Sequence, residues 1–208
     1  MSARDYYEGL WRSVPAGLVP SDLELRLSFL LAHVRAGELV LDVGCGEGRF
    51  TAELAAAGAG VVGIDVAEEP LRRARTAHPE VDVQLVDPYG PWPLADASFD
   101  VVWAGEVIEH VADTAGWLSE IRRVLRPGGR LLVSTPNHSR LAVLRLALSA
   151  RAFDTHFDPR SDHLRFYTRR TLISLLEDFG FQEVSTAAGA GPPGARRLLL
   201  TQGVRSRW

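Results

Sequence analysis

The sequence predicts an α/β protein whose mostly parallel β-sheet carries helices on both faces. Short apolar runs alternate with amphipathic helical segments between residues 38 and 135. Parallel strands are buried on both faces and therefore read as continuous apolar runs, whereas the connecting helices repeat every 3.6 residues. Glycines or acids follow the first three of these runs, and that edge of a parallel sheet is where ligands bind.

The first half of the chain supplies the beginning of this sheet. An aromatic start is followed by Ser21, a predicted N-cap for a leucine-rich helix that reaches Val34. Pro70 is tolerated in the first turn of a later helix. The predicted strands span residues 38–43, 60–64 and 81–86, and the helices between them span 48–57 and 68–77.

The second half predicts four more strands, which makes seven. Pro127-Gly128-Gly129 is expected to stop a helix and turn the chain, and Thr168 is expected to cap the last helix before Gly180. The predicted strands span 99–104, 130–135, 181–187 and 196–202, the last two joined by the flexible segment 189–194. The predicted helices span 114–125, 139–150 and 168–179, with a helical turn at 106–111. Residues 151–167 interrupt the alternation.

Composition limits the function classes. The length of 208 residues predicts one domain, residues 1–208. The net charge of −3 gives no reason to expect nucleic acid or an anionic membrane as the main partner. No apolar window reaches the roughly 18 residues of a membrane span, and the N-terminus does not read as a signal peptide. Cys45 is the single cysteine, which fits a cytoplasmic protein. The absence of lysine excludes Schiff-base chemistry and a lysine-containing phosphate loop.

The most informative stretch is a glycine-rich loop after the first predicted strand. Gly44, Gly46 and Gly48 are spaced two apart, and Asp42 precedes them. Dinucleotide-binding loops instead read Gly-x-Gly-x-x-Gly and receive a pyrophosphate. An acid directed at the loop suits a cationic ligand better, and S-adenosylmethionine (SAM) is a cation without phosphate. Asp65, at the end of the second strand, is placed to bind a ribose diol.

Together these residues resemble class I SAM-dependent methyltransferases. The matching features are, in order, Leu41-Asp42-Val43-Gly44-Cys45-Gly46-Glu47-Gly48, Gly63-Ile64-Asp65, Asp87, Phe99-Asp100-Val101-Val102 and Leu125-Arg126-Pro127-Gly128-Gly129. The resemblance implies a Rossmann-like, doubly wound sheet with an antiparallel last strand. It also implies that the glycine loop contacts the methionine part, Asp65 the ribose, Val66 and Asp87 the adenine, and Gly105 the amino-acid end. The cofactor contacts expected on this basis are Asp42, Gly44, Cys45, Gly46, Gly48, Asp65, Val66, Asp87 and Gly105.

Residues 106–110 suggest a metal site. If helical, Glu106, Glu109 and His110 share one face and could bind Mg²⁺ or another divalent cation that activates a phenol or catechol oxygen. This run resembles the Glu-x-x-Glu-His of the ubiquinone-biosynthesis O-methyltransferases, a group whose N-terminal cofactor-contacting arginine corresponds roughly to Arg26. The alternative is a site without metal, in which Glu106 and His110 shape the cofactor pocket.

Three histidines are candidate catalytic residues. His163 lies in the substrate-side insertion 151–167, His138 follows the fifth strand, and His110 belongs to the run described above. A histidine can act as a general base near neutral pH, although His163 could equally hydrogen-bond its own loop. Residues 1–37 are expected to form part of a lid.

The predicted function is methyl transfer from SAM to a small molecule, most readily a phenolic or catechol oxygen. N- or C-methylation of another metabolite without metal, an NAD-dependent oxidoreductase, and a SAM-binding subunit without catalysis are the alternatives. The protein is expected to be a monomer or a homodimer.

Overall fold

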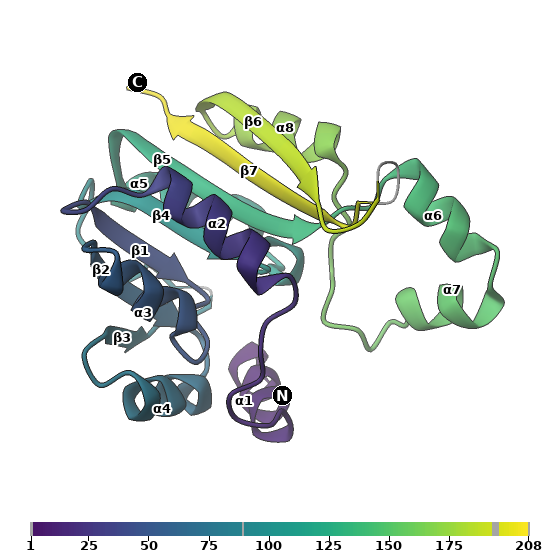
Figure 1. The fold of residues 1–208 in the computed structure, drawn as a ribbon, viewed down its shortest axis with the longest axis horizontal. Helices are drawn as coiled ribbons and strands as arrows, with labels where there is room; N and C mark the ends of the chain where they lie inside the picture. Colours follow the sequence, from purple (N-terminus) through teal and green to yellow (C-terminus); the bar gives the residue numbers. More distant parts are fainter. Residues whose placement is uncertain (1, 89, 193–195, 208) are drawn as a thin grey trace.

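A computed structural model describes residues 2–88, 90–192 and 196–207. Its centre is a seven-stranded sheet with the strand order β3-β2-β1-β4-β5-β7-β6 (Figure 1). The strands are β1 Leu39–Val43, β2 Gly60–Asp65, β3 Asp82–Leu85, β4 Phe99–Gly105, β5 Leu125–Pro136, β6 Phe181–Gly189 and β7 Leu198–Arg205. Strands β1 to β5 pair in parallel, and β7 runs antiparallel to both β5 and β6. The predicted fold class, with its antiparallel last strand, is confirmed.

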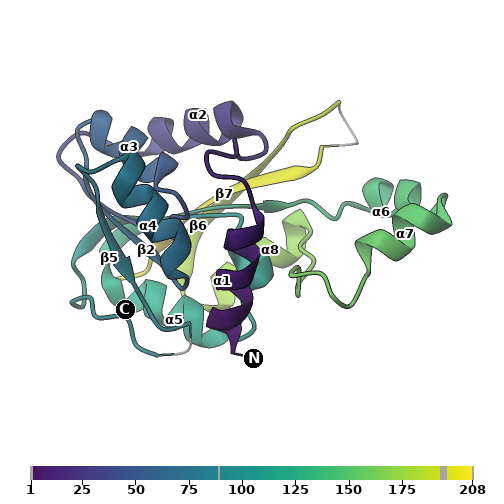
Figure 2. The same cartoon turned by 90° about the horizontal axis from the view of Figure 1, so that it is seen from below.

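Helices cover both faces of the sheet. Figure 2 shows α2, α3 and α4 on one face, and α5 and α8 on the other. The helices are α1 Ala3–Ser13, α2 Leu23–His33, α3 Arg49–Ala56, α4 Glu68–Ala77, α5 Thr114–Val124, α6 Arg140–Ala147, α7 Ala150–His156 and α8 Arg169–Asp178, and Ile108–His110 form a 3₁₀ turn, η1. Among the described residues, no helix combines the length and apolarity that crossing a bilayer requires.

The core divides along the two faces because alternate strand residues point in opposite directions. In β1, Val40 packs with α2 and α3, whereas Leu41 packs with α5 and α8. Neither side chain is exposed. Burying strands on both faces holds the C-terminal ends of β1, β2 and β4 at one edge, and the functional groups gather at that edge.

Two predicted local signals differ from the structure. Ser21 is not the cap of α2: the N-cap is Asp22, whose backbone is left-handed (φ 52°) and whose side chain makes no capping bond. The Ser21 carbonyl instead accepts a hydrogen bond from the Arg26 guanidinium (3.5 Å). Residues 127–129 do not turn the chain ahead of a strand, because β5 already begins at Leu125. They form a bulge inside β5, where Gly128 has φ 82°.

The region after β5 also differs. The predicted helix 139–150 is two helices, since the Ser149 side chain caps a new helix by accepting from the Ala152 amide. The first part of the predicted insertion is therefore helical, as α7. The Thr168 cap of α8 is confirmed through its bond with the Thr171 amide. Residues 193 and 194 of the predicted flexible segment 189–194 lie outside the described residues.

Candidate active site

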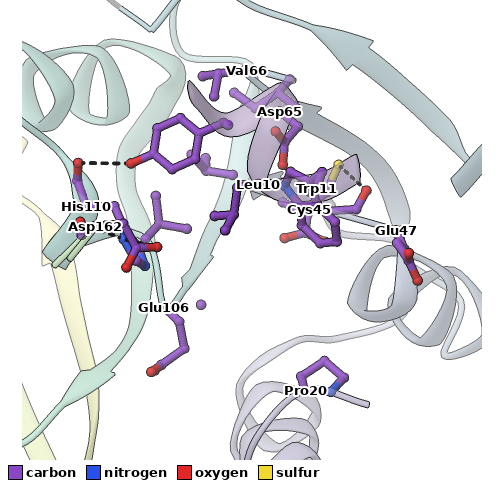
Figure 3. Close-up of a pocket in the computed structure, with 18 of the residues that line it drawn as sticks. Leu10, Trp11, Pro20, Cys45, Glu47, Asp65, Val66, Glu106, His110 and Asp162 are labelled. Atoms are coloured by element: carbon purple, nitrogen blue, oxygen red, sulfur yellow. Dashed lines mark hydrogen bonds and ion pairs between the residues drawn. The ribbon is translucent and has the colours of Figure 1, made fainter. Parts of the chain in front are cut away.

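A cavity of about 1160 Å³ opens at the C-terminal ends of β1, β2 and β4. Its floor is the loop after β1, and α1 contributes to its roof. Figure 3 shows two opposing walls separated by Leu10 of α1. One wall carries Glu106, His110 and Asp162, and the other carries Cys45, Glu47 and Asp65.

The glycine loop depends on left-handed backbone. Gly44, Gly46 and Gly48 have φ of 69°, 54° and 77°, where a side chain is strained. A Cβ at Gly44 would lie 2.5 Å from a methyl of Val107, so the loop after β4 packs directly on the loop after β1. The amides of Gly44 and Cys45 both donate to the Ile64 carbonyl, at 2.8 and 3.0 Å. These bonds fix the loop as a concave backbone surface.

Two buried acids flank this loop. Asp42 is 2% exposed and accepts a hydrogen bond from the Thr51 hydroxyl at 2.7 Å. Burial raises the pKa of Asp42 to about 7. Asp65 accepts from the amides of Gly46 (3.1 Å) and Ala67 (3.0 Å), and burial raises its pKa to about 6. Because a carboxylate offers about four acceptor positions, Asp65 retains capacity for a ligand.

Arg26 is the buried cation of the site. Its guanidinium lies 4.6 Å from the Phe50 ring centroid and 5.9 Å from that of Trp103. The side chain is almost fully buried, and its Nε has no hydrogen-bond partner. A Cβ at Gly105 would fall 2.4 Å from Arg26 Nη2, so glycine at the end of β4 makes room for the guanidinium.

Two glutamates lie beyond Gly105. Glu106 has left-handed backbone (φ 58°) and accepts from the Ser134 hydroxyl at 2.9 Å. Glu109 is fully buried, and its Oε2 accepts from the Thr135 hydroxyl at 2.9 Å, whereas Oε1 has no partner. Burial raises the pKa of Glu106, and burial together with the nearby Glu106 raises that of Glu109 to about 8.

The predicted helical face of Glu106, Glu109 and His110 does not form. The turn η1 begins only at Ile108, because the strained backbone at Glu106 separates it from the later residues. The group of potential ligands that does form joins Glu109 and His110 to His163, with one ligand atom of each within 4.8 Å of the others. Burial, together with the nearby His110, lowers the pKa of His163.

His110 is the predicted catalytic histidine that lines the cavity. Its Nδ1 lies 3.0 Å from the Asp162 carbonyl and 3.4 Å from the Asp162 carboxylate. Since a carbonyl only accepts, Nδ1 is the donor in this contact, and in the neutral ring the lone pair is therefore on Nε2. His163 packs edge-on against His110, with ring centroids 4.8 Å apart.

His138 lies in a separate cluster. Its ring contacts His156 of α7 and Phe166, with centroids at 5.2 and 4.9 Å, and it is not part of the cavity wall. Its Nδ1 is buried without a partner, and burial lowers its pKa. The structure therefore separates His138 from the other two candidate bases.

Most of the expected cofactor residues line the cavity. They are Arg26, Asp42, Gly44, Cys45, Gly46, Asp65, Val66 and Gly105. Gly48 and Asp87 are not part of its wall. Gly48 caps α3, and Asp87 accepts from the Gly90 amide at 3.0 Å, although its neighbours Val86 and Pro88 do line the cavity.

Sequence reasoning did not find the contacts that hold α1 in place. Glu8 accepts from the first amides of α4, at 2.7 and 3.2 Å, where the helix dipole favours an anion. Arg73 donates to the Trp11 and Val14 carbonyls and pairs with Glu47 of the glycine loop at 2.9 Å. The aromatic residues of α1 indicate that this segment packs against something. The sequence carries no local pattern that indicates its distant partners.

The comparisons with known proteins agree with this geometry. Residues 17–186 match a family model described as a methyltransferase domain. The chain belongs to the class I SAM-dependent methyltransferases. The resemblance stated from the sequence motifs is therefore confirmed.

Relatives support the same assignment. A probable SAM-dependent methyltransferase of Mycolicibacterium smegmatis is 41% identical over 164 residues, which cover 77% of this chain and 60% of that protein. A ubiquinone biosynthesis O-methyltransferase of Aeromonas salmonicida is 35% identical over 152 residues, covering 69% of this chain and 63% of that protein. The chain thus spans about three fifths of the length of these two methyltransferases.

A solved structure shares the fold. Phosphoethanolamine N-methyltransferase 2 of Haemonchus contortus, in complex with SAM, superposes with a TM-score of 0.76 at 17% identity, over 99% of this chain and 60% of that one. At this identity the likeness concerns the fold. The family match and the M. smegmatis relative identify SAM as the cofactor.

Proposed function

We propose that this chain transfers a methyl group from SAM to a small molecule, most readily to an oxygen on an aromatic ring. The supporting observation is the excess of buried acid around the cavity. Asp42 and Asp65 line the cavity and are each less than 10% exposed, Glu106 lines it as well, and Arg26 is the buried cation beside them. Such a site favours a ligand that is cationic and lacks phosphate.

The chain's own residues account for each part of the cofactor. Asp65 would accept from the ribose hydroxyls, and Val66 would pack on the adenine. The glycine loop would lie against the methionine part, and the Arg26 guanidinium would bind its carboxylate. When bound, SAM supplies a methyl group activated by the sulfonium, so the protein needs chiefly to align the acceptor and exclude water.

His110 is our candidate general base. It lines the cavity, and its Nδ1–H points to the Asp162 carbonyl, which leaves Nε2 able to accept a proton from an acceptor hydroxyl. A base at this place suits a hydroxyl acceptor, which becomes a strong nucleophile when it loses its proton. The name of the A. salmonicida relative, an O-methyltransferase, points the same way. N- or C-methylation of another metabolite is the alternative.

A divalent cation is the alternative to His110 as the base, with a changed ligand set, because a cation bound by His110 would occupy the Nε2 lone pair. The unpartnered Oε1 of Glu109 and the imidazoles of His110 and His163 fit a cation chemically. Two nitrogens and one carboxylate suit Zn²⁺, Mn²⁺ or Fe²⁺ better than Mg²⁺, which prefers oxygen ligands. Bound there, the cation would supply Lewis acidity toward an acceptor oxygen. Glu106, bonded to Ser134, would contribute negative charge nearby.

The N-terminal residues 1–37 are proposed as part of the lid. Trp11 lies 3.1 Å from the position that a Cβ would take at Gly46, so α1 touches the surface that we assign to the cofactor. The segment that follows α7 supplies the facing edge through Pro159, Asp162 and Leu164. We propose that these two segments enclose the acceptor.

The first experiment is calorimetric titration with SAM and, separately, with NADH. We expect micromolar SAM binding and no NADH binding, and the reverse result would replace the proposal with an oxidoreductase. Turnover is then followed as S-adenosylhomocysteine release with a panel of phenols, catechols, amines and carboxylates. Binding without turnover across the panel would favour a SAM-binding subunit.

Two further assays assign the base and the metal. His110→Ala should lower the turnover of a phenol by about 10²- to 10⁴-fold, whereas His138→Ala, outside the cavity, should leave it within about threefold. Turnover that survives EDTA and is not raised by Zn²⁺ or Mn²⁺ would end the metal hypothesis and leave His110 in place.

A further inference from the structure

The helices α6 and α7 form a hairpin that stands away from the sheet (Figures 1 and 2). Both helices are fully described, and neither contains a buried residue. Helices in globular proteins are normally stabilised by burying an amphipathic face. A hairpin of this kind therefore presents a surface that another molecule or a membrane can cover.

The exposed surface of the hairpin is strongly apolar. Leu141 and Leu144 share one face of α6, and Leu148 at its C-cap extends this face, with exposures of 42%, 59% and 81%. Phe153 and Phe157 of the second half are 41% and 40% exposed, with ring centroids 4.7 Å apart. Leaving this much apolar area in water is unfavourable.

The same hairpin is positively charged. Arg140, Arg145 and Arg151 are its basic residues, and Asp154 is its one acid. The three guanidinium groups have no ion-pair partner among the described residues, and all three side chains are exposed. This local excess contrasts with the net charge of −3 for the whole chain.

We propose that the α6–α7 hairpin docks on an anionic lipid surface. Leucine and phenylalanine would enter the headgroup boundary, and the arginines beside them would meet lipid phosphates, the arrangement expected of an interfacial amphipathic helix. A second copy of the chain fits less well, because two hairpins would bring like charges together. The segment that follows α7 lines the cavity, so docking would hold the cavity near the surface. The inference does not depend on the identity of the methyl acceptor.

Vesicle co-sedimentation of the full chain tests this proposal. Vesicles of phosphatidylcholine alone are compared with vesicles of equal parts phosphatidylcholine and phosphatidylglycerol, at low and high salt. We expect retention on the mixed vesicles that falls at high salt. The double variant Arg145→Gln/Arg151→Gln should weaken partitioning by roughly fivefold for each arginine removed. Leu144→Asp should abolish retention, because it places a charge where the apolar face enters the lipid.

Matched variants separate docking from general changes in charge or hydrophobicity. Arg169→Gln/Arg170→Gln removes two exposed arginines from α8, and Val19→Asp changes a side chain 61% exposed, close to the 59% of Leu144. Both should retain wild-type partitioning, and the melting temperature of each variant verifies folding. Absence of wild-type retention, or equal loss in the α8 variant, would overturn the proposal. A wild-type dimer in sedimentation velocity that Leu144→Asp dissociates would also overturn it and assign the face to a second copy.

Discussion

Two regions of this molecule, residues 38–105 and residues 137–167, differ in how completely their side chains and polar groups are buried and paired. In the first region, buried strands hold Asp42 and Asp65 beside a glycine loop whose backbone bonds are satisfied within the fold. In the second, α6 and α7 contain no buried residue, and one ring nitrogen each of His138 (Nδ1) and His156 (Nε2) lacks a hydrogen-bond partner. A ligand of fixed shape constrains the first region tightly. The exposed helices of the second region carry no such constraint.

The largest expected effect concerns the glycine loop. Gly44→Ala combines left-handed backbone strain with a clash against Val107, and should lower the free energy of unfolding by about 3 kcal/mol and abolish SAM binding. Gly128→Ala is the matched control, because its φ is also positive (82°) but a Cβ there meets nothing within 4 Å. It should cost about 1 kcal/mol. Equal losses in urea unfolding would show that strain alone, without packing, governs the loop.

Buried acids make the stability of the ligand-free protein depend on pH. The raised pKa values of Asp42 (about 7) and Glu109 (about 8) mean that the folded state keeps protons that the unfolded chain releases above about pH 4. Ionising these two buried carboxyl groups destabilises the folded state. This destabilisation is absent below the pKa that the groups have in the unfolded chain, and it grows as the pH rises toward their pKa values in the folded state. The free energy of unfolding should therefore fall by a few kcal/mol between about pH 5 and 8.

Substitution and ligand binding both test this pH dependence. Asp42→Asn should flatten it in urea unfolding, because the amide does not titrate. SAM is a cation that favours ionised Asp42, so its affinity should rise over the same range. An unchanged slope in the variant would remove Asp42 as the source.

Substitution of two aspartates compares a residue in the cavity wall, Asp65, with a residue beside the wall, Asp87. Asp65→Asn should weaken SAM binding by about 10- to 100-fold, because an acceptor for the ribose hydroxyls is lost. Asp87→Asn should weaken it by less than about threefold, since Asp87 bonds the Gly90 amide and is not part of the cavity wall. Calorimetry measures both. Equal losses would place Asp87 on the adenine, as the family motif implies.

The smallest expected effect concerns the attachment of α1. Arg73→Gln removes bonds to Trp11, Val14 and Glu47, and should speed hydrogen exchange in α1 by about fivefold, equivalent to about 1 kcal/mol of opening. Arg72→Gln is the control, because Arg72 is exposed and pairs only with Glu69 among the described residues. It should change exchange by less than about twofold. Similar rates in both variants would show that packing alone holds α1.

The sequence predicted the sheet well, because strand burial and glycine strain leave local signatures. The strands from β1 to β4, the Thr168 cap and the loop glycines are of this kind. The bulge at residues 127–129 was not predicted, because Pro-Gly-Gly is equally compatible with a turn. Pairing with β4 determines that these residues form a bulge within a strand. The meeting of Glu109 with His163, and of Arg73 with Glu47, depends on long-range packing. The net charge of the whole chain cannot show the locally basic α6–α7 hairpin, because it is a sum over all residues.

The contact between Gly44 and Val107 has a consequence for altering acceptor choice. Because the loop after β4 rests on the loop after β1, enlarging Val107 to reshape the acceptor pocket would disturb the methyl donor at the same time. Variation at this position is therefore coupled to donor affinity, and evolution or engineering would find few tolerated substitutions there. New acceptors are more accessible through the segment after α7, from which Pro159, Asp162 and Leu164 line the cavity.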